Sequence, residues 1–364
     1  MMKRRAFSSI KRRFLKFYTR VKRIVSFDES QVVYNGKSFK TYLEEGIKNY
    51  HRTFLNAIQV RWKSRIAFLD NGFRPDEMLL YGLDSKEKKD ADLFMSQREK
   101  DHLLISYYGS SWPDILGVLK DKYVFYSCLK DFFKREVTYI RDSGDRLAFL
   151  SFCHRHDQIF AKLNKGSCGS GAKKFSINND DQADAAFNEL VFSGEWIVEE
   201  VIKQNTVISA YNSSSVNTVR FPSFKRNGVV KSVFPCMRFG RAGDIVDNAG
   251  HGGLVVSIDQ NTGEFISDAF DEQGNVFATH PDSKIPFRGF QVPQWDALLE
   301  LVQSAHLALP DNQVYVAFDF ALSENGWCLV EGNWGDWILQ QVSLQKGLRH
   351  EFASLLTGRE KLQS

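Results

Sequence analysis

The chain has 364 residues, of which 43% are hydrophobic and 13% aromatic, and its formal net charge is +4. This composition excludes a disordered or low-complexity protein, and the length allows two or three folded domains. No hydrophobic run approaches the roughly 18 residues of a membrane span, and the basic N-terminus lacks a signal-peptide core, so we expect a cytoplasmic protein. The five cysteines are scattered without a CxxC pair, which argues against disulfides and a zinc site.

Residues 1–27 predict a basic amphipathic helix. Ten of the residues up to Arg23 are Lys or Arg and none is acidic, while hydrophobic residues from Phe7 to Ile24 recur at helical spacing. Such a helix can bind the inner face of an anionic membrane, or it can pack on its own domain with a solvated basic face. Both interpretations stay open, and a third, a nucleic-acid arm, is not expected.

Residues 28–120 predict a helical N-terminal region without a chemical motif, with helices near Phe39–Trp62 and Asp84–Leu104. Residues 121–210 predict a first α+β subdomain, and residues 211–364 a second one. In the first subdomain we expect the helices Asp121–Phe133 and Gln182–Phe192 and the strands Val137–Ile140, Ile159–Leu163, Lys174–Ile177 and Trp196–Ile202. In the second we expect the strands Thr218–Phe224, Val229–Phe239 and Leu254–Ile258, the helix Trp295–Leu309, a hairpin around Gly326 and a last helix Leu339–Leu356.

The strand that carries Lys162 leads into a glycine-rich loop, which contains Gly166, Ser167, Gly169 and Gly171. Glycine lets backbone N–H groups approach phosphate oxygens closely, and a lysine on the strand adds positive charge. The spacing matches neither of the common glycine signatures. A phosphate-binding loop and a plain flexible hairpin are therefore equally supported.

Residues 195–202 are a hydrophobic strand interrupted by Glu199 and Glu200 and ending at Ile202. Backbone at the end of such a strand can read the edge of an adenine ring. A strand at the edge of a sheet, protected by charge, explains the same pattern. The segment alone does not decide between the two.

Arg220 and Arg238 lie within hydrophobic strands. Because arginine is rarely buried without a partner, each should face an anion, either a carboxylate of the fold or a phosphate or carboxylate of a substrate. His251 and His280 lie in turn sequences and are candidates for proton transfer, although histidines in loops more often bond locally.

Residues 314–333 combine a predicted hairpin with three oxygen ligands. A hydrophobic strand, a turn that ends at Gly326 and a returning strand place Asp319 beside the return strand. Glu331 and Asn333 share one face, because side chains alternate along a strand. Two carboxylates and an amide suit Mg²⁺, whereas the alternative is a surface hairpin with an acidic edge. Carboxylates on core strands are costly without a compensating cation, which favours the metal.

In chain order these motifs resemble the ATP-grasp fold: Lys122 at the start of a helix, Lys162 before the glycine-rich loop, a Val-Glu-Glu-Val strand, and the acidic hairpin. Over residues 70–350 the chain is similar to the sugar-transfer-associated ATP-grasp family. The motifs that carry this likeness are Asn217-Thr-Val-Arg220, Arg238, Asp247-Asn248 with Gly252-Gly253, His280-Pro-Asp282, Gln291-Val-Pro293 and Glu331-Gly-Asn333. The resemblance implies an α+β protein, an ATP-grasp fold of two α+β subdomains with a helical N-terminal region.

The resemblance also implies that ATP binds between the two subdomains. Lys122 and Lys162 would contact its phosphates, and the loop from Gly166 to Gly171 would close over them. Glu199 and the backbone near Glu200–Ile202 would meet the adenine. The ligands of Mg²⁺ would be Asp319, Glu331 and Asn333. No acid follows the adenine strand at the position where relatives often bind ribose, so that contact stays unassigned.

The reaction implied is that of an ADP-forming ligase. A substrate carboxylate would attack the γ-phosphate of ATP to give an acyl phosphate, and an amine would then attack the acyl carbon. Arg220 or Arg238 would stabilise the substrate carboxylate or the tetrahedral oxyanion. The expected substrates are a sugar acid and an amino acid, in polysaccharide biosynthesis or glycan modification. The alternatives are an ATP-grasp phosphotransferase acting on a sugar and a non-catalytic, membrane-associated scaffold.

Overall fold

The computed structural model describes residues 16, 18–34, 36–49, 54–166, 171–241, 243, 252–335 and 337–359. The chain forms two compact units, one of Met1–His102 with Lys346–Arg349 and the other of Leu103–Gln345 with His350–Ser364. Most of the predicted N-terminal helix lies outside the described residues, although residues 18–25 are helical. The predicted boundaries near residues 120 and 210 stay predictions.

The first unit is helical, as expected. Its elements are β1 (Val33–Tyr34), β2 (Lys37–Ser38), α2 (Phe39–Asn49), α3 (Phe54–Asn71), α4 (Pro75–Leu80), α5 (Lys88–Ala91) and the first half of α6 (Gln97–Tyr108). The predicted helix near Phe39–Trp62 is thus divided between α2 and α3. Phe27, Phe39 and Phe68 pack edge to face in the core of this unit, with ring centroids 4.9 to 5.5 Å apart.

The second unit contains two sheets within the described residues. A four-stranded antiparallel sheet has the order β3-β6-β4-β5, with β3 (Val137–Ile140), β4 (Gln158–Leu163), β5 (Lys173–Ser176) and β6 (Trp196–Glu200). A larger sheet has the order β12-β11-β10-β9-β7-β13-β14, with β8 paired to β7. Its strands are β7 (Thr218–Arg226), β8 (Val229–Ser232), β9 (Cys236–Phe239), β10 (Leu254–Ser257), β11 (Ala269–Phe270), β12 (Val276–Phe277), β13 (Tyr315–Ser323) and β14 (Gly326–Asn333).

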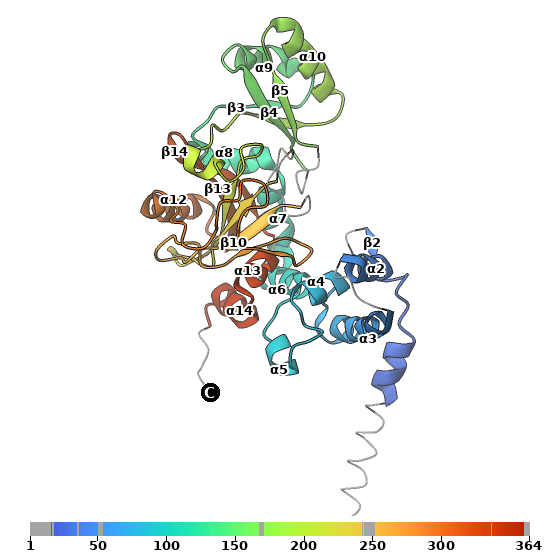
Figure 1. Ribbon diagram of the computed structural model, residues 1–364. Coiled ribbons are helices and arrows are strands. Elements are labelled where there is room, and N and C mark those ends of the chain that lie inside the picture. The colour runs from blue at the N-terminus through green and yellow to red at the C-terminus, as the bar shows by residue number, and fades with distance from the viewer. Residues whose placement is uncertain are drawn as a thin grey trace, which may run out of the picture. The chain divides into compact units, whose positions relative to one another are not determined.

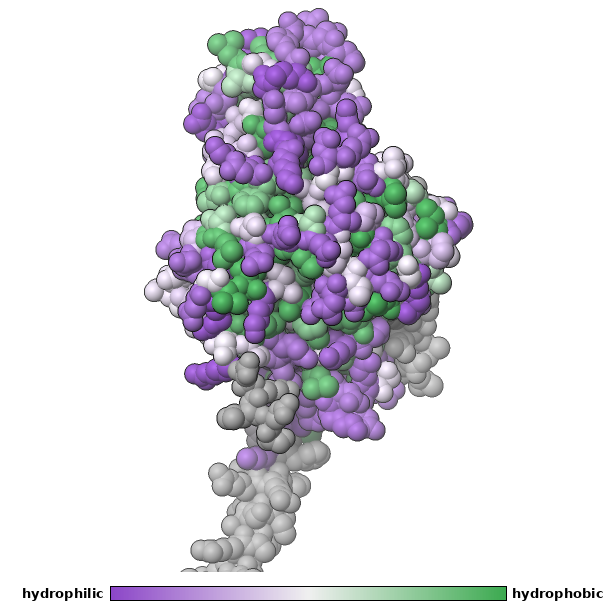
Figure 2. Space-filling view, turned by 90° about the vertical axis from the view of Figure 1, so that its left-hand side faces the viewer, coloured by the Kyte–Doolittle hydropathy of each residue, from purple (hydrophilic) through white to green (hydrophobic). Residues whose placement is uncertain are grey.

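The four-stranded sheet packs against α9 (Arg146–Cys153) and α10 (Asp180–Val191), which lie together on it (Figure 1). Asn179 caps α10 by accepting a hydrogen bond from the Gln182 N–H at 2.9 Å. Trp196 and Phe149 are among the buried residues of this subdomain. Its surface is mainly hydrophilic on the face drawn in Figure 2, because the hydrophobic side chains gather between sheet and helices.

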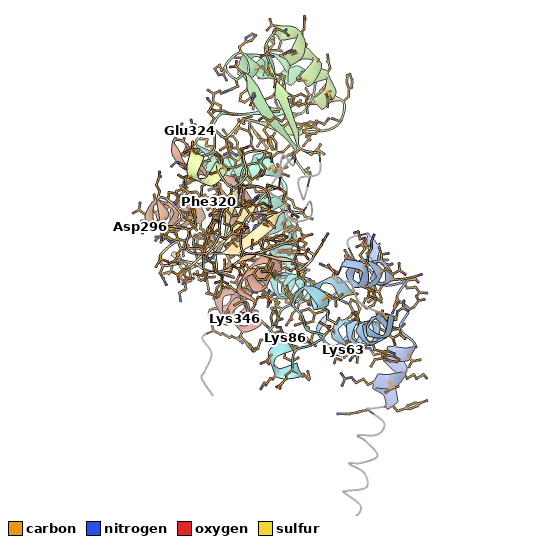
Figure 3. All side chains as sticks on the ribbon, in the orientation of Figure 1. Lys63, Lys86, Asp296, Phe320, Glu324 and Lys346 are labelled. Carbon is orange, nitrogen blue, oxygen red and sulfur yellow. The ribbon has the colours of Figure 1, made fainter. Side chains whose placement is uncertain are left out.

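The larger sheet carries the main core of the unit. One face packs against α8 (Lys122–Phe133) and α12 (Trp295–Ala308), where alternate strand residues such as Phe318 and Phe320 are fully buried. Phe320 is labelled in Figure 3. The other face is covered over β9, β10 and β11 by α13 (Ile338–Leu344). The remaining helices of the unit include α7 (Trp112–Lys120), α11 (Thr206–Ser209) and α14 (Arg349–Thr357).

Two predicted elements are interrupted where the backbone turns left-handed. The predicted strand Val229–Phe239 is two strands, β8 and β9, because Phe234 between them has φ +51°. The predicted last helix Leu339–Leu356 is α13 and α14, because Gln345 has φ +51° and ends α13. Among the helices that the structure describes, none combines the length and hydrophobicity of a membrane span.

The alternative for residues 195–202, a strand at the edge of a sheet, is wrong. β6 lies between β3 and β4 and pairs with both. The carboxylates of Glu199 and Glu200 on β6 therefore do not protect a sheet edge.

Candidate functional site

Arg220, Asp319 and Glu331 lie in one row across three neighbouring strands. Asp319 on β13 is the cross-strand partner of Arg220 on β7 and of Glu331 on β14. Directly opposed residues of antiparallel strands point to the same face, so the three side chains meet. A β-bulge after Asp319 shifts the register of the hairpin beyond this row.

Both predicted arginines bind the carboxylate of Asp319, which is 1% exposed. Arg220 donates from Nε to Oδ1 at 2.8 Å and from Nη2 to Oδ2 at 2.7 Å. Arg238 on β9 donates from Nη1 to Oδ2 at 3.0 Å. The expectation that each arginine faces an anion is met by a carboxylate of the fold, the first of the two options that the sequence left open.

Asp319 is held in its charged form. Burial alone would raise the pKa of its carboxyl, but the charges of Arg220 and Arg238 and the hydrogen bonds from Arg220 outweigh burial and lower the pKa. The carboxylate is therefore ionised at neutral pH and fixes two guanidinium groups on the sheet.

Asn333 joins the two carboxylates. Its Nδ2 lies 3.3 Å from Asp319 Oδ2 and 3.3 Å from Glu331 Oε1. Within the described residues, no three His, Cys, Asp or Glu side chains come together as an ion-binding group. The predicted metal ligands are therefore two carboxylates and one amide that lie close together on the sheet.

Lys122 approaches this point from the start of α8. The helix packs closely on β14 because Gly332 has no side chain: a Cβ there would lie 2.4 Å from the Phe125 ring. Burial lowers the pKa of the Lys122 ammonium and Lys162 lowers it further, whereas the charge of Glu331 opposes them. Lys122 Nζ donates to the carbonyl of Gly166 at 2.6 Å, at the entrance of the glycine-rich loop.

Lys162 belongs to a buried ion-pair cluster on the four-stranded sheet. Its Nζ lies 2.9 Å from Glu199 Oε1, and Arg135 Nη2 lies 2.6 Å from Glu199 Oε2. Burial would raise the pKa of Glu199, but the charges of Arg135 and Lys162 lower it overall. Arg135 Nη1 also donates to the Leu329 carbonyl at 2.6 Å, which ties this cluster to β14.

Sequence reasoning missed Arg135. It precedes β3 without a motif, and its partners Glu199 and Leu329 lie 64 and 194 residues away along the chain. The signal that could have found it is Glu199, because a carboxylate buried within a hydrophobic strand needs a cationic partner.

The glycine-rich loop is described only at its two ends, Gly166 and Gly171; Ser167 and Gly169 lie outside the described residues. Gly171 has φ +83°, and a Cβ there would lie 2.8 Å from a methyl group of Leu163. Both observations require glycine at this end of the loop.

Glu200 and Ile202 lie at the end of β6 and in the segment after it. Glu200 Oε2 accepts from the Glu136 N–H at 3.2 Å, and Ile202 is half-buried. The segment continues along the hairpin, where the Glu324 N–H, at the turn marked in Figure 3, donates to the Lys203 carbonyl at 2.9 Å. Among the described residues, neither Glu200 nor Ile202 bonds to the carboxylates of β13 and β14.

His280 has a local, buried role. Its Nε2 lies 3.1 Å from the Gly240 carbonyl, and its Nδ1 accepts from the Asp282 N–H at 3.2 Å. Burial lowers its pKa, so the ring is neutral and both nitrogens are occupied. His251 lies outside the described residues, as do Asp247 and Asn248.

Three of the solved structures that resemble the chain are a synthetase and two ligases by their titles. D-alanyl-alanine synthetase A from Vibrio cholerae O1 biovar eltor str. N16961 is 15% identical, with 68% of this chain and 66% of that chain covered and a TM-score of 0.41. D-alanine-D-alanine ligase from Coxiella burnetii is 10% identical, with 67% and 59% covered and a TM-score of 0.41. The ATP-grasp ligase PsnB, complexed with a minimal precursor, is 11% identical, with 68% and 63% covered and a TM-score of 0.41. The chain thus spans 59 to 66% of the length of these three proteins.

No curated protein sequence matches the chain. Residues 179–356 match the model of the family described as sugar-transfer associated ATP-grasp. This range contains β6 with Glu199, the larger sheet with Arg220 and Arg238, and the hairpin with its carboxylates. Residues 179–356 are thus similar to the sugar-transfer associated ATP-grasp family, the family that the motifs predicted.

Proposed function

We propose that the protein is an ATP- and Mg²⁺-dependent carboxylate–amine ligase that releases ADP. The observation that carries this proposal is the proximity of two groups: the candidate oxygen ligands Asp319, Glu331 and Asn333, and the half-buried lysines Lys122 and Lys162. The charges of Glu331 and Glu199 raise the pKa of Lys122 and that of Lys162 lowers it, although burial lowers the pKa most, so these groups lie within electrostatic range of one another. A cation and a polyphosphate bound side by side require this combination.

The residues fit Mg²⁺. Two carboxylates and an amide oxygen leave room for water and phosphate oxygens, which Mg²⁺ retains as its other ligands. Asn333 donates its amide N–H to both carboxylates here, and as a ligand it would turn its oxygen to the ion. A bound Mg²⁺ would neutralise negative charge on the phosphates.

Lys122 and Lys162 would hold the phosphates, each with a defined anchor. Lys162 is oriented by its ion pair with Glu199, and Lys122 by the Gly166 carbonyl. The loop containing Ser167 and Gly169 would cover the phosphates. Glu199 and the backbone from Glu200 to Ile202 would contact the adenine.

Arg220 and Arg238 would bind the reacting acid. Because Asp319 fixes both guanidinium groups before any substrate arrives, they need no reorganisation when negative charge develops. A carboxylate oxygen would bond to the γ-phosphorus as the bond to ADP breaks. The amine would then bond to the acyl carbon, lose its proton and expel phosphate.

The family description supports substrates from polysaccharide biosynthesis or glycan modification, with a sugar acid as the acid and an amino acid as the amine. The test is a screen of such pairs with ATP and Mg²⁺, with ADP release measured and the product identified by mass. An amide accompanied by ADP and phosphate supports the ligase. A stable phosphorylated sugar would instead establish the phosphotransferase, and absence of Mg²⁺-ATP binding would favour a scaffold.

We also propose that the N-terminal segment contacts the inner face of an anionic membrane. In the helical residues 18–25, Tyr18, Val21 and Val25 are exposed, at a spacing that places them on one side of a helix. Ile24 is buried against the first unit, and Arg65 donates to its carbonyl at 3.1 Å. The exposed residues Lys16, Arg20, Lys22 and Arg23 supply positive charge beside the exposed apolar side chains.

Sedimentation with anionic vesicles tests this contact. The full chain with Tyr18, Val21 and Val25 replaced by Ser should lose vesicle binding while its thermal unfolding stays unchanged, because these side chains are exposed. Undiminished binding by this variant would show that the exposed residues do not contact lipid.

A further inference from the structure

The first turn of α8 is capped from two places in the chain. The Val124 N–H donates to Asp121 Oδ1 at 3.0 Å, the ordinary bond of an N-cap residue. The two preceding donors are taken by Asn164, about 40 residues later: the Lys122 N–H donates to its carbonyl at 3.3 Å and the Tyr123 N–H to its Oδ1 at 3.0 Å. Asn164 therefore completes the start of the helix that carries Lys122.

Asn164 is itself held from its other side. It is 1% exposed, and its Nδ2 donates to Tyr139 Oη at 3.0 Å and to Glu195 Oε2 at 3.2 Å. Tyr139 Oη in turn donates to Glu195 Oε2 at 2.7 Å. The Asn164 side chain thus uses its acceptor and both donors, each on a different residue.

The same residue stands between Lys162 and the glycine-rich loop. Asn164 follows the end of β4, two residues after Lys162 and two before Gly166. The Asn164 N–H also donates to the Glu195 carbonyl at 2.9 Å, which fixes this turn to the start of β6. One buried amide therefore connects the strand of Lys162, the helix of Lys122 and the entrance of the loop.

The helix start is consequently not a second anion site. The N–H groups from Lys122 to Val124 already have partners within the protein. The Lys122 ammonium, in contrast, extends to the loop, where it donates to the Gly166 carbonyl. Displacement of the turn would move this ammonium relative to Lys162. The stacked rings of Tyr123 and Tyr139, with centroids 4.1 Å apart, hold the same turn from outside.

We propose that Asn164 is a positioning residue that sets Lys122 beside Lys162 for phosphate binding. It acts through Lys122 and does not touch the nucleotide. The inference rests on the proposed function, since it assumes that the two lysines bind the phosphates of Mg²⁺-ATP.

The test is a thermodynamic cycle of Mg²⁺-ATP binding, measured by calorimetry on the full chain. Asn164→Ala should weaken binding about tenfold or more, as loss of residues that orient ligands commonly does. In a Lys122→Ala background the same change should have little further effect, because two residues that act through one contact are not additive. Asn179→Ala, which removes the cap of α10 in the same subdomain, is the control and should leave binding unchanged.

A second variant pair keeps the test valid if Asn164→Ala does not fold. Asn164→Asp retains the acceptor for the Tyr123 N–H but places a carboxylate against Glu195, so binding should weaken. Adding Glu195→Gln supplies the missing donor and should restore Mg²⁺-ATP affinity to within a few fold of wild type.

Three results overturn the inference. If Asn164→Ala weakens Mg²⁺-ATP binding equally in the wild-type and Lys122→Ala backgrounds, Asn164 does not act through this lysine. The proposed nucleotide site would be unaffected by that result. Failure of Glu195→Gln to restore affinity would show that the amide contacts do not set the position of the turn. Absence of Mg²⁺-ATP binding by the wild type would overturn both the proposed function and the role of Asn164.

Discussion

Arg220 and Asp319 face each other across β7 and β13 and are joined by two hydrogen bonds of 2.8 and 2.7 Å. Removing one member of a buried ion pair leaves the other charge uncompensated, which typically costs about 3–5 kcal/mol. Arg238 also contacts Asp319 and so limits this cost. The pair therefore links stability of the larger sheet with orientation of the groups proposed to bind the reacting acid.

Arg220→Lys should lower both turnover and thermal stability. Lysine keeps the charge but cannot form the two parallel bonds of a guanidinium, so we expect kcat to fall by about 10²- to 10³-fold. Arg226→Lys on the same strand is the matched control, because the Arg226 guanidinium donates to the Leu356 carbonyl and has no contact with Asp319 among the described residues. Wild-type kcat in Arg220→Lys would show that the paired geometry is unimportant.

Glu331→Gln should raise the Mg²⁺ concentration needed for half-maximal activity by about tenfold or more, because a neutral amide binds the ion less strongly than a carboxylate. Titration with MgCl₂ at saturating ATP measures the change. Glu324→Gln, at the exposed turn of the same hairpin, removes an equal charge and should leave the titration unaltered. If both variants shift it equally, the effect is one of net charge and the ligand assignment is wrong.

Gly332→Ala should destabilise the second unit by about 1–3 kcal/mol, as overpacking of a core commonly does. The added Cβ would lie 2.4 Å from the Phe125 ring and would push α8 away from β14. Chemical denaturation measures the loss. Gly117→Ala, inside α7 with no atom within 4 Å of the new Cβ, is the control and should stabilise slightly. Equal stability of Gly332→Ala and wild type would contradict the close packing of α8.

Stability should fall below about pH 6.5, partly because of His306. Burial lowers the pKa of this fully buried ring from its ordinary value of 6.5 to about 4, although its bond to the Gln313 carbonyl opposes the shift. The unfolded chain takes up a proton near pH 6.5 and the folded chain does not. The contribution of the neutral His306 ring to the free energy of unfolding is therefore complete above pH 6.5. It is lost as the pH falls toward 4, to a limit of about 3 kcal/mol.

Denaturation of wild type and His306→Gln at pH 7, 6 and 5 tests this linkage. The variant should be less stable at pH 7 but should lose less on acidification. Some pH dependence of the variant's stability should persist, because burial also lowers the pKa of His280. Parallel curves for the two proteins would exclude His306 as a source of the pH dependence.

Local patterns in the sequence account for much of this molecule. The apolar spacing of α8, the exact bounds of β3 and the pairing of Asp319 with the return strand all follow from periodicity and turn residues, which act over a few residues. The left-handed residues Phe234 and Gln345 could not be foreseen, because neither is a residue type that favours this conformation.

The contacts that assemble the site were harder to predict. Arg135 with Glu199 and Asn164 with Tyr123 join residues 64 and 41 positions apart, and no spacing rule connects them. His280 was a candidate for proton transfer, although histidines in loops more often bond locally. The structure buries it under its own turn, where it bonds to backbone.

The most direct measurement of the central claim is the product balance of the purified protein with Mg²⁺-ATP and pairs of sugar acids and amino acids. We expect one ADP and one phosphate for each amide formed, and no turnover by Asp319→Ala with the same substrates. A stable phosphorylated product would contradict the ligase assignment, and equal turnover by Asp319→Ala would contradict the assignment of Asp319 to the metal.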